Sequence, residues 1–266
     1  MKRTLPFEFV YQIGSLLIAI IVVHLVYITL IRPNAEAILA AEAQRSAAGE
    51  EFVQQRSLYI VLRDYEQESC LILGLWSFAI MGFKIRTAIR ERALFDTPII
   101  NVSEGTSILP EDTREYIRPI QALPVEVREY LLPRALLAAL LRFASTRNVH
   151  DVSETVKSVC EAESERLDSE LSMVRYIAWA VPAIGFVGTV RGIGEALSQA
   201  YRAVQGDIAG VTASLGTAFN STFVALVISI VMMFVLHQLQ LIQDRLVQDT
   251  QTFCDQRLLR HLQVRG

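Results

Sequence analysis

The distribution of charged residues is the strongest pattern in the chain, because long stretches hold none. Residues 9–31 and 208–243 are uncharged runs of 23 and 36 residues. A bilayer core about 30 Å thick is crossed by about 20 helical residues, and a charged side chain at its centre is costly. The two runs therefore predict two membrane-spanning helices. The first exceeds the apolar stretch of a signal peptide, about 7–15 residues, so we expect a retained anchor.

Two shorter uncharged runs, residues 69–83 and 176–190, predict two further spans. Each holds 15 residues and is bracketed by charged residues. Arg and Lys side chains at such ends extend toward the lipid headgroups, so a short helix can still cross. A buried or interfacial helix is the alternative for residues 69–83, which leaves three spans. The favoured prediction is four spans, within residues 1–31, 69–84, about 175–197 and about 213–240.

The segments between the spans predict the remaining organisation. Residues 32–68 are compatible with helix and form either a hairpin that extends the first two spans on the periplasmic side or a plain connector. Residues 85–172 have a soluble composition. Within them, residues 96–124 are rich in Pro and turn formers without a helical period. From residue 125 apolar residues recur every three to four positions, which predicts helices, the last running unbroken into the third span.

Lysine and arginine cluster at the N-terminus, after the second span and in the tail, residues 246–266. The positive-inside rule therefore predicts that residues 85–172 and both termini are cytoplasmic. Together these patterns predict an all-α integral membrane protein with four transmembrane helices. The first two form an N-terminal hairpin, the last two are long, and helical extensions reach into the cytoplasm.

The composition agrees with a membrane protein and excludes other classes. Hydrophobic residues make up 52% of the chain and charged residues 20%, with a mean hydropathy of +0.35. Disorder requires the opposite balance, and a net charge of −3 does not favour nucleic-acid binding. The three cysteines are far apart and predict neither disulfides nor a metal site.

The sequence contains no P-loop and no G-x-S-x-G, H-E-x-x-H or C-x-x-C motif, so we do not expect an enzyme. The four histidines are scattered, without a carboxylate or cysteine at ligand spacing. His24, inside the first span, is the only buried candidate; we expect a structural role for it, with a proton relay as the alternative. No cofactor is predicted.

The third span carries a stripe of small residues. Gly185, Gly188 and Gly192 are three and four positions apart and line one helical face, which favours close helix packing in lipid. Pro182 removes a backbone hydrogen bond and predicts a bend. Thr189 adds a hydroxyl near the glycine face. In the alternative interpretation, this hydroxyl only bonds the carbonyl four residues earlier in its own helix.

The fourth span carries hydroxyl groups. Ser214, Thr217 and Ser221 recur at steps of three and four, with Asn220 and Thr222 beside them. Such a polar stripe either forms hydrogen bonds between helices or lines an aqueous path. The core of each span holds no Asp, Glu, Lys or Arg. If the chain conducts protons, a partner must therefore supply the titratable carboxylate.

The segment VPAIGFVGTVRGIGEAL, residues 181–197, resembles the signature of the MotA/TolQ/ExbB proton channel family, and LGTAFNSTFVALVISI, residues 215–230, resembles its final span. The likeness covers about residues 150–245. Arg191 departs from the family pattern, in which an apolar or aromatic residue is usual. If Arg191 faces the pathway entrance it repels cations; extension outward is the favoured alternative.

The resemblance implies a larger stator subunit in the bacterial inner membrane. It implies a homopentamer around a dimer of a single-span MotB-, TolR- or ExbD-like partner whose membrane Asp carries H⁺, or Na⁺ as the alternative. Residues 173–245 would form the channel domain with two pore-lining helices. The implied pathway residues are Thr189 and Thr222, with Thr217, Ser221 and Asn220. An oligomeric scaffold, in which both stripes only pack helices, remains the alternative.

Overall fold

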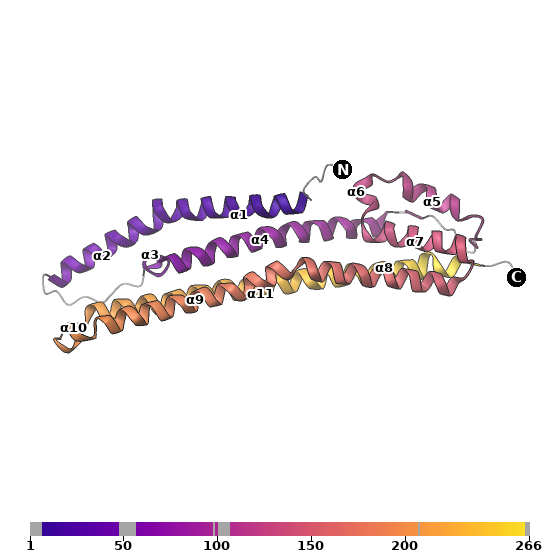
Figure 1. Ribbon diagram of the computed structural model, residues 1–266. Coiled ribbons are helices and arrows are strands. Elements are labelled where there is room, and N and C mark those ends of the chain that lie inside the picture. The colour runs from indigo at the N-terminus through magenta and orange to yellow at the C-terminus, as the bar shows by residue number, and fades with distance from the viewer. Residues whose placement is uncertain (1–6, 48–56, 98, 101–106, 207, 264–266) are drawn as a thin grey trace, which may run out of the picture. The chain divides into compact units, whose positions relative to one another are not determined.

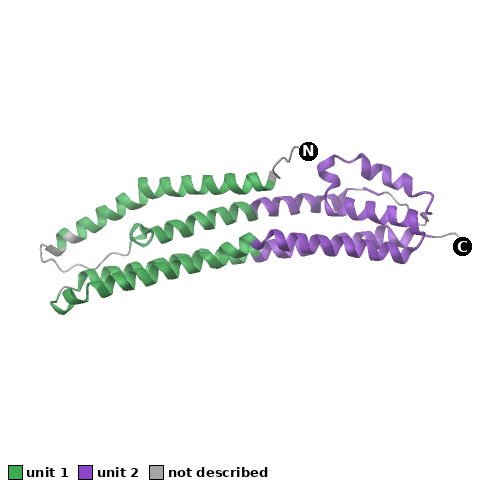
Figure 2. Ribbon diagram, in the orientation of Figure 1, with its two compact units in different colours: residues 1–81, 173–236 green, residues 82–172, 237–266 purple. Residues whose placement is uncertain are grey.

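The chain is almost entirely helical in the computed structural model, which describes all residues except 1–6, 48–56, 98, 101–106, 207 and 264–266 (Figure 1). No strand occurs among the described residues, and the one β-type contact is an isolated bridge between Ile108 and Leu262. The described residues form two compact units, shown in separate colours in Figure 2. They comprise residues 1–81 with 173–236, and residues 82–172 with 237–266.

Four helices are long and apolar enough to cross a membrane, which confirms the predicted all-α membrane fold. Continuous helical stretches cover Glu8–Glu42, Tyr65–Asp96, Val149–Ser198 and Ala209–His261. Each extends well beyond the uncharged run that predicted it. The second has 32 residues, so the short run at residues 69–83 is the apolar part of a longer helix.

The first unit contains the four apolar segments. Its elements are α1 (Phe7–Val26), the π-helical turn η1 (Tyr27–Ile31), α2 (Arg32–Ala47), α3 (Leu58–Val61), the first part of α4 (Tyr65–Arg92), α9 (Ser172–Ser198), α10 (Ala200–Val204) and the first part of α11 (Ala209–Arg257). The connector predicted at residues 32–68 thus contains two helices, while its residues 48–56 lie outside the described part.

A π-helical turn joins α1 to α2 into one helical stretch (Figure 1). The Arg32 N–H donates to the carbonyl of Tyr27, five residues earlier. Pro33 follows immediately, and a proline inside a helix removes a backbone donor. Side chains bond two nearby carbonyls: Thr29 donates to Leu25 and Asn34 to Leu30. The helix therefore passes the proline with one extra residue in its register.

The second unit has a small hydrophobic core of its own. Its elements are the end of α4, η2 (Ala93–Asp96), α5 (Thr113–Ala122), α6 (Val125–Arg128), α7 (Leu131–Thr146), α8 (Val149–Glu170), the end of α11 and η3 (Leu259–His261). Fully buried side chains from several helices meet there, including Leu136, Phe143, Val156 and Cys254.

One expectation for residues 85–172 needs correction. The Pro-rich stretch at residues 96–124 contains the helix α5, in which Thr113, Ile117 and Ile120 are buried. Their spacing of four and three is an amphipathic pattern that the turn formers obscured. The last helix before the third span does continue into it, because α8 and α9 form one helical stretch, Val149–Ser198, with a single turn residue at Leu171.

Candidate functional site

The glycines of α9 let it approach α11 closely. A Cβ added at Gly185 would lie 2.4 Å from the Cβ of Ala225. At Gly188 it would lie 2.5 Å from Ser221 Oγ, and at Gly192 it would lie 2.8 Å from the backbone nitrogen of Ala218. These distances are too short for any side chain. The predicted glycine stripe thus lies against α11, and the contact between the two helices is called the α9–α11 seam below.

Two threonines form a polar pair at this seam. The hydroxyls of Thr189 and Thr222 are within hydrogen-bond distance of each other. Thr189 Oγ1 also lies 3.1 Å from the carbonyl oxygen of Ala218, and Thr222 Oγ1 lies 3.1 Å from that of Gly185. Each hydroxyl has one hydrogen, so donation to the carbonyl and donation to the other threonine are alternatives. The pair can therefore exchange hydrogen-bond arrangements without moving a backbone atom.

Thr189 is also 3.4 Å from the carbonyl of Gly185, four residues earlier in its own helix. The structure thus adds contacts across the seam to the intrahelical bond that was the alternative expectation. Both threonine side chains are half-buried. The hydroxyls and carbonyls offer oxygen atoms that suit a proton relay or a sodium ion.

Pro182 lies within α9, which is helical on both sides of it. A proline has no backbone N–H, so the carbonyl of Ala178, four residues earlier, lacks its usual donor. Ser229 of α11 donates its hydroxyl to that carbonyl at 3.4 Å. The neighbouring carbonyl of Val181 accepts the thiol of Cys70 from α4 at 3.6 Å. The proline region is therefore held from two other helices.

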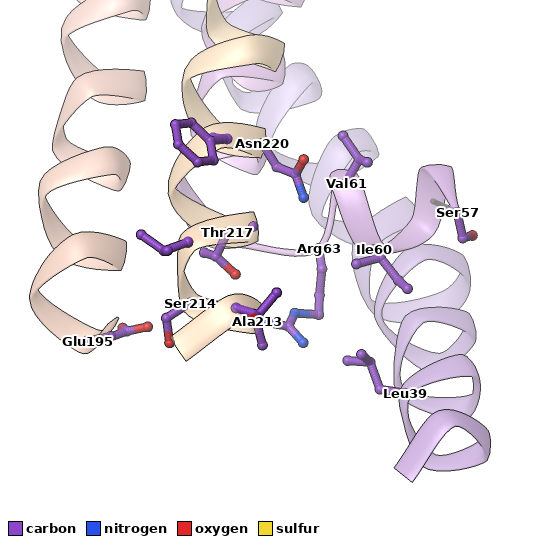
Figure 3. Close-up of a pocket in the computed structure, with 14 residues that line it drawn as sticks. Leu39, Ser57, Ile60, Val61, Arg63, Glu195, Ala213, Ser214, Thr217 and Asn220 are labelled. Atoms are coloured by element: carbon purple, nitrogen blue, oxygen red, sulfur yellow. The ribbon is translucent and has the colours of Figure 1, made fainter. Parts of the chain in front are cut away.

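The other predicted pathway residues are also on α11. Ser221 is fully buried and donates to the carbonyl of Ala218 in its own helix. Thr217 and Asn220 line a cavity of about 520 Å³ in the first unit, which also has Arg63 and Glu195 in its wall (Figure 3). The structure thus brings Thr189 and Thr222 together but does not place Thr217 and Asn220 in hydrogen-bond contact with them.

Arg191 is held by carboxylates. It donates to both oxygens of Glu66 on α4, from Nε at 2.7 Å and from a terminal nitrogen at 2.9 Å. It also donates to Glu195 one helical turn later, at 2.9 Å. The nearest carboxylate oxygen of Asp64 is 3.9 Å away. The arginine that departs from the family pattern is therefore neutralised by acidic side chains at this end of α9.

The sequence shows no carboxylate near His24, but in the structure the imidazole has an acidic partner. Its Nδ1 lies 2.6 Å from Oε1 of Glu68, whose other oxygen accepts a hydrogen bond from Arg32. The Glu68 side chain is only 7% exposed, whereas that of His24 is 52% exposed, so His24 is not a buried histidine. Sequence reasoning missed the cluster because Glu68 borders an uncharged run and lies 44 residues from His24.

A second group of buried charges lies in the second unit. Lys84 is 2.7 Å from Glu170. Glu163 accepts hydrogen bonds from Arg134 and Arg166. Burial alone would raise the pKa of Glu163, but the hydrogen bonds and charges of the two arginines together lower it.

Glu91 of α4 accepts a hydrogen bond from the backbone N–H of Leu131, the first residue of α7. Burial raises the pKa of this carboxyl group, and the Leu131 N–H opposes the shift only in part. Within the described residues, no group of three or more His, Cys, Asp or Glu side chains is placed to bind a metal ion.

Comparison with known proteins finds one family. Residues 128–252 match the model of the MotA/TolQ/ExbB proton channel family. The matched segment contains α7, α8, α9 and most of α11, and so both helices of the α9–α11 seam. Neither the curated proteins nor the solved structures give a match.

Proposed function

Because residues 128–252 match the model of the MotA/TolQ/ExbB proton channel family, we propose that the chain is the larger, ion-pathway subunit of a membrane stator. In this proposal it couples the flow of protons to mechanical work. The observation that carries it is the hydroxyl pair of Thr189 and Thr222 at the α9–α11 seam. Two exchangeable hydroxyls beside backbone carbonyls suit the wall of an ion pathway.

The proposal requires a second chain for the titratable group. The atoms at the threonine pair are hydroxyls and backbone carbonyls, and a hydroxyl does not release a proton near neutral pH. We therefore assign the ion-carrying carboxylate to a MotB/TolR/ExbD-like partner with a single span. Five copies of this chain would surround two copies of the partner, in a bacterial inner membrane with both termini cytoplasmic.

In the proposed assembly, residues 173–245 form the channel domain, and α9 and α11 line the pore. Thr189 and Thr222 face the partner's carboxylate. Pro182 acts as the point of flexure, with Ser229 and Cys70 holding the carbonyls around it. Thr217 and Asn220 would meet the ion nearer the cavity lined by Arg63 and Glu195.

Proton flux is the direct test. The complex purified through this chain from its native membranes is reconstituted into liposomes that contain a pH-sensitive dye, and a pH gradient is imposed. Thr189→Val and Thr222→Val are expected to lower the flux at least tenfold while the complex keeps its size. Thr252→Val is the control, because Thr252 is an exposed threonine of α11 outside the proposed channel domain. Wild-type flux in both seam variants would contradict the assignment.

The transported ion is tested in the same liposomes. We propose H⁺, with Na⁺ as the alternative, since hydroxyl and carbonyl oxygens also bind sodium. A sodium gradient imposed at constant pH is expected to drive no transport. Sodium-dependent transport without acidification would overturn the choice of ion but leave the channel function standing.

A non-conducting scaffold is the second candidate, and one observation favours it. Thr189 and Thr222 each reach a carbonyl of the opposite helix at 3.1 Å, which is the geometry of interhelical bonding alone. A scaffold predicts no flux with any partner. It also predicts that Gly188→Leu, which forces a side chain onto Ser221, disrupts the oligomer far more than either threonine substitution does.

A further inference from the structure

The π-helical turn η1 changes which residues share a face of the first helix. Arg32 follows His24 by eight residues, which in a regular α-helix places it about 80° past two full turns. The turn inserts one extra residue before Arg32. Around the helix axis, Arg32 then lies where the seventh residue after His24 would lie in a regular α-helix. Its direction is within about 20° of that of His24. The register shift thus turns the imidazole and the guanidinium toward the same neighbour.

That neighbour is Glu68 of α4. Its Oε1 lies 2.6 Å from His24 Nδ1, and its Oε2 accepts from Arg32. Arg32 also lies over the ring of Tyr65, with its guanidinium carbon 4.3 Å from the ring centre. A carboxylate with a side chain 7% exposed requires such partners, since an unpaired buried charge is costly. Arg32 alone balances the charge of Glu68.

His24 therefore adds a group that the charge balance does not require. An imidazole is the side chain that binds and releases a proton near neutral pH. With Nδ1 facing Glu68, Nε2 is the nitrogen left to bind a proton. Proton uptake converts a hydrogen bond into an ion pair. We propose that His24 and Glu68 form a proton-binding site on this chain itself, and that its occupancy strengthens the attachment of α1 to α4.

The other charged and titratable groups around this site are accounted for. On the first helix they are Tyr27 and Arg32. On the α4 side they are Asp64, Tyr65 and Glu66, with Cys70 one turn further on. Glu66 is paired with Arg191 of α9. The Tyr27 hydroxyl is buried and has no hydrogen-bond partner among the described residues. It is therefore a further polar group beside the His24–Glu68 site.

This site is separate from the threonine pair, and the inference stands whether or not the α9–α11 seam conducts ions. The test is a double-mutant cycle on the full chain in lipid nanodiscs, with His24→Gln, Glu68→Gln and the double variant. Thermal unfolding gives the coupling between the two side chains. We expect the coupling, expressed as an equilibrium constant, to be at least fivefold larger at pH 5.5 than at pH 8.5. Equal coupling at both pH values, or none at either, would overturn the proposal.

A direct measurement keeps the inference testable if a variant folds poorly. In wild-type protein with ¹⁵N-labelled histidine, the His24 ring signals are identified by their loss in His24→Gln. They are expected to change from neutral to imidazolium shifts between pH 8.5 and 5.5. His150→Gln serves as the control, because His150 is an exposed histidine of α8. His24 signals that stay neutral down to pH 5.5 would overturn the site even if the variants cannot be compared.

Discussion

Ser229 of α11 donates its hydroxyl hydrogen to the carbonyl oxygen of Ala178 in α9, with 3.4 Å between the two oxygens. Ala178 lies four residues before Pro182, which cannot supply the helical N–H that this carbonyl would normally accept. A side chain of the neighbouring helix thus compensates for the proline. The proline and the serine should therefore be energetically coupled across the α9–α11 seam.

We predict that Ser229→Ala lowers the stability of the protein by about 1 kcal/mol, because the Ala178 carbonyl loses its donor. In a Pro182→Ala background the same substitution should cost much less, since the new backbone N–H at position 182 bonds that carbonyl. Thermal unfolding of the four proteins in one detergent measures the difference. Ser198→Ala is the control, because Ser198 is exposed and bonds within its own turn. An equal loss in both backgrounds would contradict the coupling.

Two glycines of α9 make a matched pair for testing the close approach at the seam. A Cβ at Gly192 would lie 2.8 Å from both the Cβ and the backbone nitrogen of Ala218, whereas a Cβ at Gly194 meets nothing within 4 Å. Gly192→Ala should cost about 1–3 kcal/mol by overpacking. Gly194→Ala should stabilise by up to about 1 kcal/mol through helix propensity. Unfolding midpoints and size-exclusion profiles check both, and a similar loss in the two variants would show that the clash is not the cause.

The seam could be anticipated from sequence because its information lies within single helices. Steps of three and four place Gly185, Gly188 and Gly192 on one face whatever the rest of the chain does, and the structure lays that face against α11. Periodicity says nothing about the residue opposite. The pairing of Thr189 with Thr222, and of Ser229 with Ala178, needed the relative register of two helices.

The acidic partners could not be anticipated for two physical reasons. Glu66 and Arg191 are 125 positions apart, and no local pattern encodes such a contact. The approach of Arg32 to the face of His24 depends on the π-helical turn, which shifts the register that a regular period assumes. Glu68 also marks the start of the second predicted span when uncharged runs are counted. The structure shows instead that its side chain is only 7% exposed and bonded to the first helix.

The ion pair of Arg191 and Glu66 should respond to exchange of its charges. Arg191→Glu places a carboxylate beside Glu66, Glu195 and Asp64, so we expect a loss of about 1–2 kcal/mol, moderated because Arg191 is 39% exposed. Adding Glu66→Arg should recover at least half of it. Thermal unfolding at low and high salt measures both, with Arg202→Glu on the exposed α10 as the control. Failure of the exchange to recover stability would indicate that packing, not charge, fixes this contact.

Glu91 gives the second unit a predictable pH dependence. Burial raises the pKa of its carboxyl group above the value in the unfolded chain. The folded state therefore binds this proton more readily than the unfolded state. The stability that Glu91 contributes is complete below the unfolded pKa and is lost as the pH rises through the folded pKa. The loss is about 1.4 kcal/mol for each unit by which folding raises the pKa.

Glu91→Gln removes this titration but keeps an oxygen that can accept the Leu131 N–H. We predict that the variant gains stability relative to the wild type as the pH increases from 4.5 to 8.5. Unfolding midpoints measured across that range test the prediction, with Glu126→Gln on the exposed face of α6 as the control. A difference that stays constant with pH would mean that Glu91 does not titrate there. A difference that shrinks would mean that the N-terminus of α7 stabilises the carboxylate more than burial destabilises it.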